Sequence, residues 1–445
     1  MGLSSFIGSS LEEVSAGRYI SLMMYGGEQS MSSVKKLYLY NLLTAASLTV
    51  VAEFLFVDQL LLRIQTDLAV IGVLKAFVFF LPVVSYQLAV PLLNRTHWEI
   101  LLCAYFYVLR AVLPALVPVA ALLGARNATL QWMCIIILPV AMMLATFANN
   151  ALMIIYRRLL PSDRFNRDIG IIQMCFFLPC LVLGIPVSLI FKRAAVLDDR
   201  SFFVVYLTAM LVCALFQLPA FAVMRSLGGV RGQHEESTPE NEAGMGWVRP
   251  YRDPHYRKTL TVTFLHALVS GVGIAYIGVF CLKIMELSVS STFIVRTVAS
   301  IIGMVLMPYA GQLADKIGYS RMYLWLGVLL SIGLAVPVVF PHPWMLPLCA
   351  LLFWDGANSP VGLALQTCEQ AAASKLAPAL NTAGYIAAFN VARCAGIGMG
   401  ALAAGMLFGA VTRFGFSEAE GLRLVFAACL LPLVLLAVAG GKRER

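Results

Sequence analysis

The strongest constraint on this chain is a series of long apolar runs, each about as long as a helix that crosses a bilayer. Such a helix needs roughly 20 consecutive apolar residues. The runs do not show the alternation that is typical of transmembrane β-strands. We therefore predict an all-α polytopic membrane protein with twelve transmembrane helices, at residues 38–61, 68–90, 98–123, 131–155, 170–191, 201–224, 260–282, 290–310, 322–340, 345–367, 382–409 and 421–440.

Composition excludes several other classes of protein. The chain is 60% apolar and only 12% charged, whereas roughly a quarter of the residues of a soluble domain are charged. A soluble enzyme, a disordered chain and a disulfide-stapled secreted module are therefore excluded. The ten cysteines form no close pair and no zinc-like spacing with histidine. We expect no resident metal and no cofactor.

The positions of the basic residues predict the orientation in the membrane. Most of the 32 Lys and Arg residues fall in the loops and tails on one side of the predicted helices, and loops rich in these residues stay in the cytoplasm. Both termini are thus expected in the cytoplasm of a multi-pass protein of the cell membrane. This bias also accounts for the net charge of +9, so no nucleic acid partner is expected and the lipid bilayer is the main surroundings.

A long polar stretch divides the chain into two sets of six runs. It spans residues 226–258 and has the composition of a flexible linker. We predict a cytoplasmic tail at 1–36, a six-helix bundle at 37–225, the linker at 226–258, a second six-helix bundle at 259–440, and a short tail at 441–445. Below, the two bundles are called the first and the second half.

The loop after the eighth run carries a motif with a readable physical role. It runs from Gly311 to Arg321 and reads GQLADKIGYSR. Gly311 and Gly318 would allow a tight turn. Asp315 can accept hydrogen bonds at the start of a neighbouring helix, and Lys316 and Arg321 can hold acidic groups of the other half.

A weaker copy of this motif follows the second run, where Asn94 and Arg95 stand at the positions of Asp315 and Lys316. The pattern of Gly311 to Arg321 resembles the loop signature of the major facilitator superfamily, G-x-L-a-D-r-x-G-r-r-r. The resemblance implies two six-helix bundles, secondary transport, and a cytoplasmic latch that breaks when the protein opens inward. The alternative is a basic turn without a gating role.

Two ionisable residues lie deep in the first pair of runs. A charge inside a membrane helix is costly and by default functional. Glu53 and Lys75 are placed at similar depth below the outer boundary, and we predict that they can pair, either as a static ion pair or in a coupling role. Asp58 is predicted to lie nearer the surface, in contact with water.

The tenth run contains the most polar and breakable stretch. Gly356 and Pro360 weaken the helix there, beside Asp355 and Asn358. Asp355 and Arg393 of the eleventh run both lie near the middle of the membrane. They are candidates for contact with solute or proton, with a structural pair between adjacent helices as the alternative. The glycines of the eleventh run are predicted to permit close helix packing.

Other polar residues in the runs complete the set of candidates. Arg110 of the third run and Asn149 of the fourth are predicted contacts for solute or proton. His266 of the seventh run is a candidate polar residue of the cavity, and Glu369 of the tenth is a candidate member of the cytoplasmic latch. For Arg110 the alternative is a pair with a carboxylate of the first run, and for Asn149 and His266 it is an ordinary interhelical hydrogen bond.

These features favour a transporter over an enzyme. The chain contains no catalytic or nucleotide-binding motif. We predict a monomeric secondary active transporter that moves a small solute by alternating access of its two halves, with protons as a candidate coupling ion. The alternatives are a receptor or scaffold of the same fold that does not transport, and efflux of drugs or metabolites.

Overall fold

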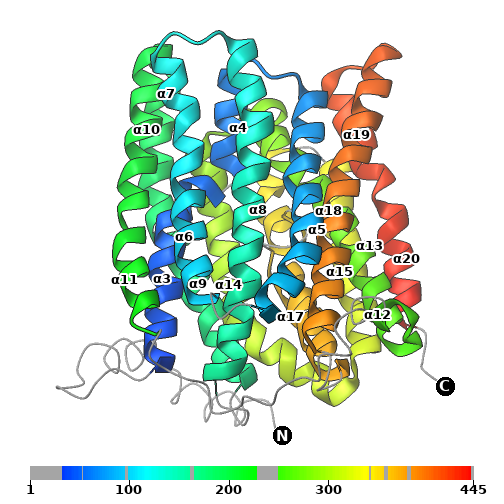
Figure 1. Cartoon of the computed structure of the whole chain (residues 1–445). Helices are drawn as coiled ribbons and strands as arrows, with labels where there is room; N and C mark the ends of the chain where they lie inside the picture. The colour runs from blue at the N-terminus through cyan, green and yellow to red at the C-terminus, as the bar shows by residue number, and fades with distance from the viewer. Residues whose placement is uncertain are drawn as a thin grey trace, which may run out of the picture.

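The computed structural model describes residues 33–52, 54–95, 99–160, 165–227, 249–339, 342–354, 359–377 and 382–441. In this part of the chain, helices run side by side along one axis (Figure 1). We call the end at which the first helix starts and the last one finishes the near end, and the opposite end the far end. Several predicted runs comprise two consecutive helices.

The first half comprises α3 (Ser33–Ala52), α4 (Phe54–Arg63), α5 (Leu68–Arg95), α6 (Glu99–Val112), η1 (Leu113–Ala115), α7 (Leu116–Leu122), α8 (Asn127–Leu159), α9 (Phe165–Ala194), α10 (Asp199–Leu215) and α11 (Gln217–Arg225). The second half comprises α13 (Pro254–Val279), η3 (Phe280–Ile284), α14 (Val289–Ile317), α15 (Tyr319–Val339), η4 (Pro343–Met345), α16 (Leu346–Leu352), α17 (Pro360–Leu376), α18 (Thr382–Arg413), α19 (Glu418–Ala428) and α20 (Leu430–Gly441).

Ten helices in the described residues are long and apolar enough to cross a membrane. The two predicted runs without such a helix, 38–61 and 345–367, are each interrupted by residues outside the described part, Glu53 in the first and 355–358 in the second. A multi-pass membrane protein is therefore confirmed, and the count of twelve stays a prediction. The short helix α12 (Arg249–Arg252) and the start of α13 lie within the predicted linker, residues 226–258.

Polar side chains cap the start of several of the described helices. Asp253 accepts hydrogen bonds from the backbone N–H groups of His255 and Tyr256 at the start of α13, which satisfies donors that have no partner inside the helix. Asp198 does the same for α10 through Ser201. Hydrogen bonds from the Ser201 hydroxyl and then from the Ser201 backbone N–H lower the pKa of the Asp198 carboxyl from its usual value.

The break in the tenth run follows from its residues. Phe353 ends α16 in an extended conformation. The extended Ser359 starts α17, where its side chain accepts a hydrogen bond from Gly362 N–H and Pro360 occupies the first helical turn. Proline suits this position because it lacks the N–H that would otherwise need a partner. α16 and α17 are therefore separate helices.

The loop motif forms a turn of one residue. Gly318 alone separates α14 from α15, with φ of +86°, a conformation that favours glycine. The predicted turn role is thus confirmed for Gly318 and wrong for Gly311, which lies inside α14. The apolar run continues through Gly311 into the motif, and the helix continues with it.

Glycines bring α18 unusually close to two neighbours. A Cβ atom added to Gly400 would overlap the backbone carbonyl of Leu268 on α13, and one added to Gly72 on α5 would lie 2.8 Å from the Cα of Gly405. Backbone contact of this kind needs residues without side chains. α18 therefore packs against α13 of its own half and α5 of the other, as its glycine pattern predicts.

We expect Gly400→Ala to destabilise the protein by about 1–3 kcal/mol, because its methyl group has no space against Leu268. The measurement is thermal unfolding of the purified full-length protein in detergent. Gly409→Ala on the same helix is the matched control, since its Cβ would meet Ala69 Cβ at an ordinary 3.5 Å. Equal melting temperatures for both variants would contradict the close approach of α18 and α13.

Candidate functional site

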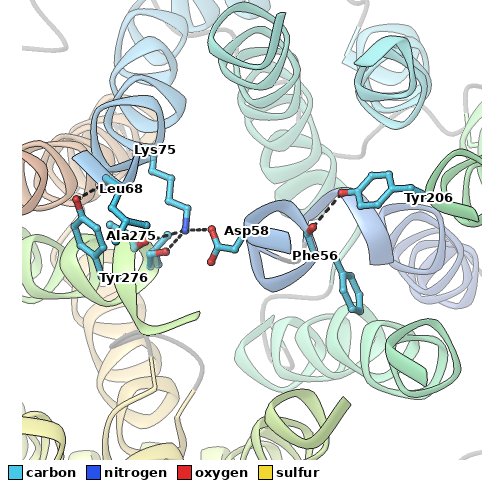
Figure 2. Close-up of polar contacts among 8 residues, drawn as sticks. Phe56, Asp58, Leu68, Lys75, Tyr206, Ala275 and Tyr276 are labelled. Atoms are coloured by element: carbon cyan, nitrogen blue, oxygen red, sulfur yellow. Dashed lines mark hydrogen bonds and ion pairs between the residues drawn. The ribbon is translucent and has the colours of Figure 1, made fainter. Parts of the chain in front are cut away.

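A completely buried lysine forms the centre of the candidate site. Lys75 on α5 is 0% exposed and forms an ion pair with the carboxylate of Asp58 on α4, which is 1% exposed. The two side chains point directly toward each other (Figure 2). Removing two charges from water is costly, and the pair is tolerated because each charge offsets the other.

Lys75 also connects the two halves of the protein. Its Nζ donates hydrogen bonds to the backbone carbonyls of Ile274, at 2.7 Å, and Ala275, at 3.0 Å, both on α13. An ammonium group has three donors, and here the carboxylate and two carbonyls accept all three. A side chain of the first half thus holds the backbone of the second.

The neighbouring contacts pack the far end tightly around this pair. Tyr276, the residue after Ala275 on α13, donates a hydrogen bond of 2.9 Å to the carbonyl of Leu68 on α5 (Figure 2). The rings of Phe56 on α4 and Phe293 on α14 stack with centroids 5.4 Å apart. Gly184 on α9 leaves space for the Phe293 ring. Two hydrogen bonds from Lys75 and one from Tyr276 therefore join the two halves toward the far end, beside the stacked rings of Phe56 and Phe293.

The predicted surroundings of Asp58 need correction. Asp58 was predicted to contact water, and that prediction was wrong, because Asp58 is buried and paired. α4 continues to Arg63, beyond the predicted boundary, so Asp58 lies five residues inside its helix and Lys75 seven residues inside α5. The two residues are therefore at matching depth. Glu53 lies outside the described residues.

Arg110 and Asn149 lie around one tyrosine nearer the middle of the bundle. Tyr107 on α6 donates a hydrogen bond to the side-chain carbonyl of Asn149 on α8 and interacts electrostatically with Arg110. Arg110 is buried, whereas Asn149 is exposed. The structure thus brings these two predicted residues together through Tyr107, which sequence reasoning missed.

Arg393 belongs to the same level of the bundle. It is half-buried on α18 and interacts electrostatically with Tyr86 of α5, whose hydroxyl is hydrogen-bonded to Cys394. These residues of both halves lie about 16 Å along α5 from Lys75, at 1.5 Å per residue. Lys75 therefore belongs to a separate level.

The remaining predicted residues are placed only in part. Asp355 and Asn358 lie outside the described residues. Asp315 lies in α14, and its side chain is outside the described part of the structure, whereas Lys316 and Arg321 are exposed at the near end. The latch role of this motif stays a prediction.

A pocket of about 560 Å³ opens at the far end, between the α4–α5 and α18–α19 loops. Thr66 and Asp67 line it from the first half, and Lys283, Phe408 and Glu418 line it from the second. Lys283 and Glu418 form an ion pair of 2.7 Å in which both side chains are close to half exposed. This pocket lies on the loop side of the buried Lys75 level.

Comparison with protein families identifies the architecture. The sequence pattern of the Major Facilitator Superfamily matches residues 147–401, which is more than half of the chain. The chain belongs to the Major Facilitator Superfamily. The match extends from α8 to α18 and so includes helices of both halves. A search of the curated proteins found no match.

Solved transporter structures share this major facilitator fold at low sequence identity. The nucleoside transporter NupG has a TM-score of 0.65 and 14% identity, over 93% of this chain and 100% of its own. An inward-facing bacterial homologue of the human lysosomal transporter Spinster has a TM-score of 0.60 and 15% identity, over 92% of this chain and 95% of its own. An outward-facing bacterial homologue of the iron transporter ferroportin has a TM-score of 0.61 and 16% identity, over 92% of this chain and 98% of its own.

We predict that Asp58 and Lys75 stabilise the protein as one unit. Lys75→Met or Asp58→Asn alone should each cost about 3–5 kcal/mol, because either leaves a buried polar group without its partner. The double variant should cost clearly less than the sum of the two. The measurement is denaturant or thermal unfolding in detergent.

The matched control is the exposed pair of Lys283 and Glu418, where single neutral substitutions should cost about 0–1 kcal/mol. Strictly additive effects at Asp58 and Lys75 would contradict the ion pair.

Proposed function

We propose that this chain is a secondary active transporter that moves a small solute across the cell membrane by alternating access of its two halves, coupled to protons. Its near end faces the cytoplasm, and the chain works as a monomer. Membership of the Major Facilitator Superfamily supports transport as the function. The observation that carries the proposal is the buried Lys75, which reaches from one half to backbone carbonyls of the other at the far end.

Bonds of this kind suit an interface that opens and closes. Each hydrogen bond from a charged donor contributes about 1.5–3 kcal/mol, so the pair from Lys75 stabilises a closed far end without making it permanent. When α13 moves away, Lys75 keeps Asp58 as its partner and no charge is left alone. The far end can therefore open at moderate cost, which alternating access requires.

The solute is proposed to bind at the level of Tyr86, Tyr107, Arg110, Asn149 and Arg393, where both halves contribute polar groups near the middle of the bundle. Asp355, Asn358 and Glu53 remain candidates for the same role. In the opposite state, with the near end closed, we propose that Asp315, Lys316 and Arg321 act as the cytoplasmic latch.

The test is uptake by purified protein in liposomes, with and without a proton gradient, over a panel of nucleosides, sugars, amino acids and iron. We expect at least one solute to be accumulated, and accumulation to depend on the gradient. The absence of flux for every solute would instead favour a receptor or scaffold that does not transport.

The double variant Asp58→Asn with Lys75→Met then tests the far-end contact. Loss of about 1.4 kcal/mol from the closed state changes its population roughly tenfold, so we expect the transport rate to fall by about this factor or more. Lys283→Gln is the matched control and should transport at the rate of the unchanged protein. An unchanged transport rate in the double variant would contradict a role of the Lys75 contact in alternating access.

A further inference from the structure

A second buried ionisable pair lies inside the second half, away from the Lys75 level. His266 on α13 and Glu369 on α17 approach to 2.9 Å between Nδ1 and Oε1. Their exposed fractions are 5% and 1%. Both groups belong to the second half, and the contact of Lys75 with Asp58, Ile274 and Ala275 does not include them.

The protonation of this pair is restricted by its burial. A neutral histidine beside an ionised Glu369 would leave a net negative charge out of water, which is costly. One proton shared by the two groups makes the pair neutral overall, whether it resides on the imidazole or on the carboxyl. The buried pair therefore favours holding one proton.

Contact with water changes this preference. A histidine in water titrates near pH 6.5 and a glutamate near pH 4.3, so a hydrated pair loses its proton at neutral pH. Burial binds the proton and hydration releases it. A motion of α13 or α17 that admits water would thus be linked to the transfer of one proton.

The helices packed against α13 and α17 carry further ionisable groups. Asp58 and Lys75, from α4 and α5, bind each other, and α20 contains no ionisable residue. The charges of α12 and α19 lie toward the two ends of α13. Besides Glu369, the ionisable residues of α14, α15, α17 and α18 are Arg296, Tyr309, Asp315, Lys316, Tyr319, Arg321, Tyr323, Cys368, Lys375, Tyr385, Arg393, Cys394 and Arg413, of which Cys368 is next to Glu369 in sequence.

The two helices that hold the pair are also placed to move it. α13 carries the carbonyls that bind Lys75, and Ile274 lies eight residues, about 12 Å, beyond His266 on the same helix. α17 is separated from α16 by the extended residues Phe353 and Ser359. Rearrangement at the far end can therefore reach His266, while α17 is free of the constraint of a continuous helix.

We propose that His266 and Glu369 form the proton-binding site of this transporter, which holds one proton while buried and releases it when water enters between α13 and α17. The proposal rests on the proposed function and names the site of its coupling ion. The step is a simple proton transfer: water on one side of the membrane supplies the proton, and water on the other side accepts it.

Proton binding can be measured without knowledge of the solute. Infrared difference spectra of the full-length protein in liposomes, recorded between pH 5 and pH 9, report the imidazole and the protonated carboxyl. We expect a titration of about one proton per chain that disappears in the double variant His266→Gln with Glu369→Gln. Two glutamine side chains can still hydrogen-bond, so the packing of α13 on α17 is retained.

Two further variants decide between a proton site and a static pair. Glu369→Asp keeps a carboxylate and, unlike the double glutamine variant, should still show a titration, at a shifted pH. Glu418→Gln removes an exposed carboxylate that is also paired and should leave the His266 signal unchanged. Identical imidazole and carboxyl spectra in the unchanged protein and the double glutamine variant would overturn the proposal.

Transport separates this proposal from the proposed function. With an accumulated solute, the proton gradient should change accumulation in the unchanged protein by up to about tenfold per pH unit, and the double glutamine variant should lose this dependence while still exchanging solute. Flux that keeps its full gradient dependence in the variant would overturn the proton site and leave transport intact. A titration at His266 without flux of any solute would instead refute transport.

Discussion

The arrangement of the two halves depends on how one ammonium group is satisfied where water is absent. Lys75 is fully buried, and its three donors find one carboxylate and two backbone carbonyls. The carboxylate offsets the charge, while the carbonyls fix where α13 lies against α4 and α5. The glycine and aromatic contacts nearby, such as Gly72 beside Gly405, follow from this placement because they need the same close approach. A charge that hydrocarbon would exclude thus determines the geometry of the far end.

Much of the fold was predictable because bilayer thickness dictates the length of an apolar run. The helices follow the predicted runs closely, and Gly318 and the break before Pro360 were expected from local backbone chemistry. The depth of Asp58 was not, because it depends on where α4 ends, and a helix can continue past the last apolar residue into Arg63. Gly311 was misplaced for the same reason. A glycine in an apolar run marks a turn or a close contact equally well.

The candidate site shows a similar division. Lys75, Arg110, Asn149 and Arg393 could be selected one at a time, since each is costly or polar inside a membrane. Their partners could not be selected, because partners are chosen by packing between helices that are distant in sequence. His266 and Glu369 are separated by 103 positions, and nothing in either apolar run indicates the other. The partners of Tyr86 and Tyr107 were equally unpredictable, because the sequence around each tyrosine does not indicate which helix it faces.

The use of backbone carbonyls as acceptors for Lys75 has a consequence for how this protein can change. Every amino acid supplies the same carbonyl, so replacing the side chain of Ile274 or Ala275 leaves both acceptors in place. Asp58 and Lys75 of the first half take part in this contact through their side chains, whereas α13 takes part only through its backbone. Ile274 and Ala275 can therefore vary without loss of the two hydrogen bonds from Lys75, whereas Asp58 and Lys75 cannot.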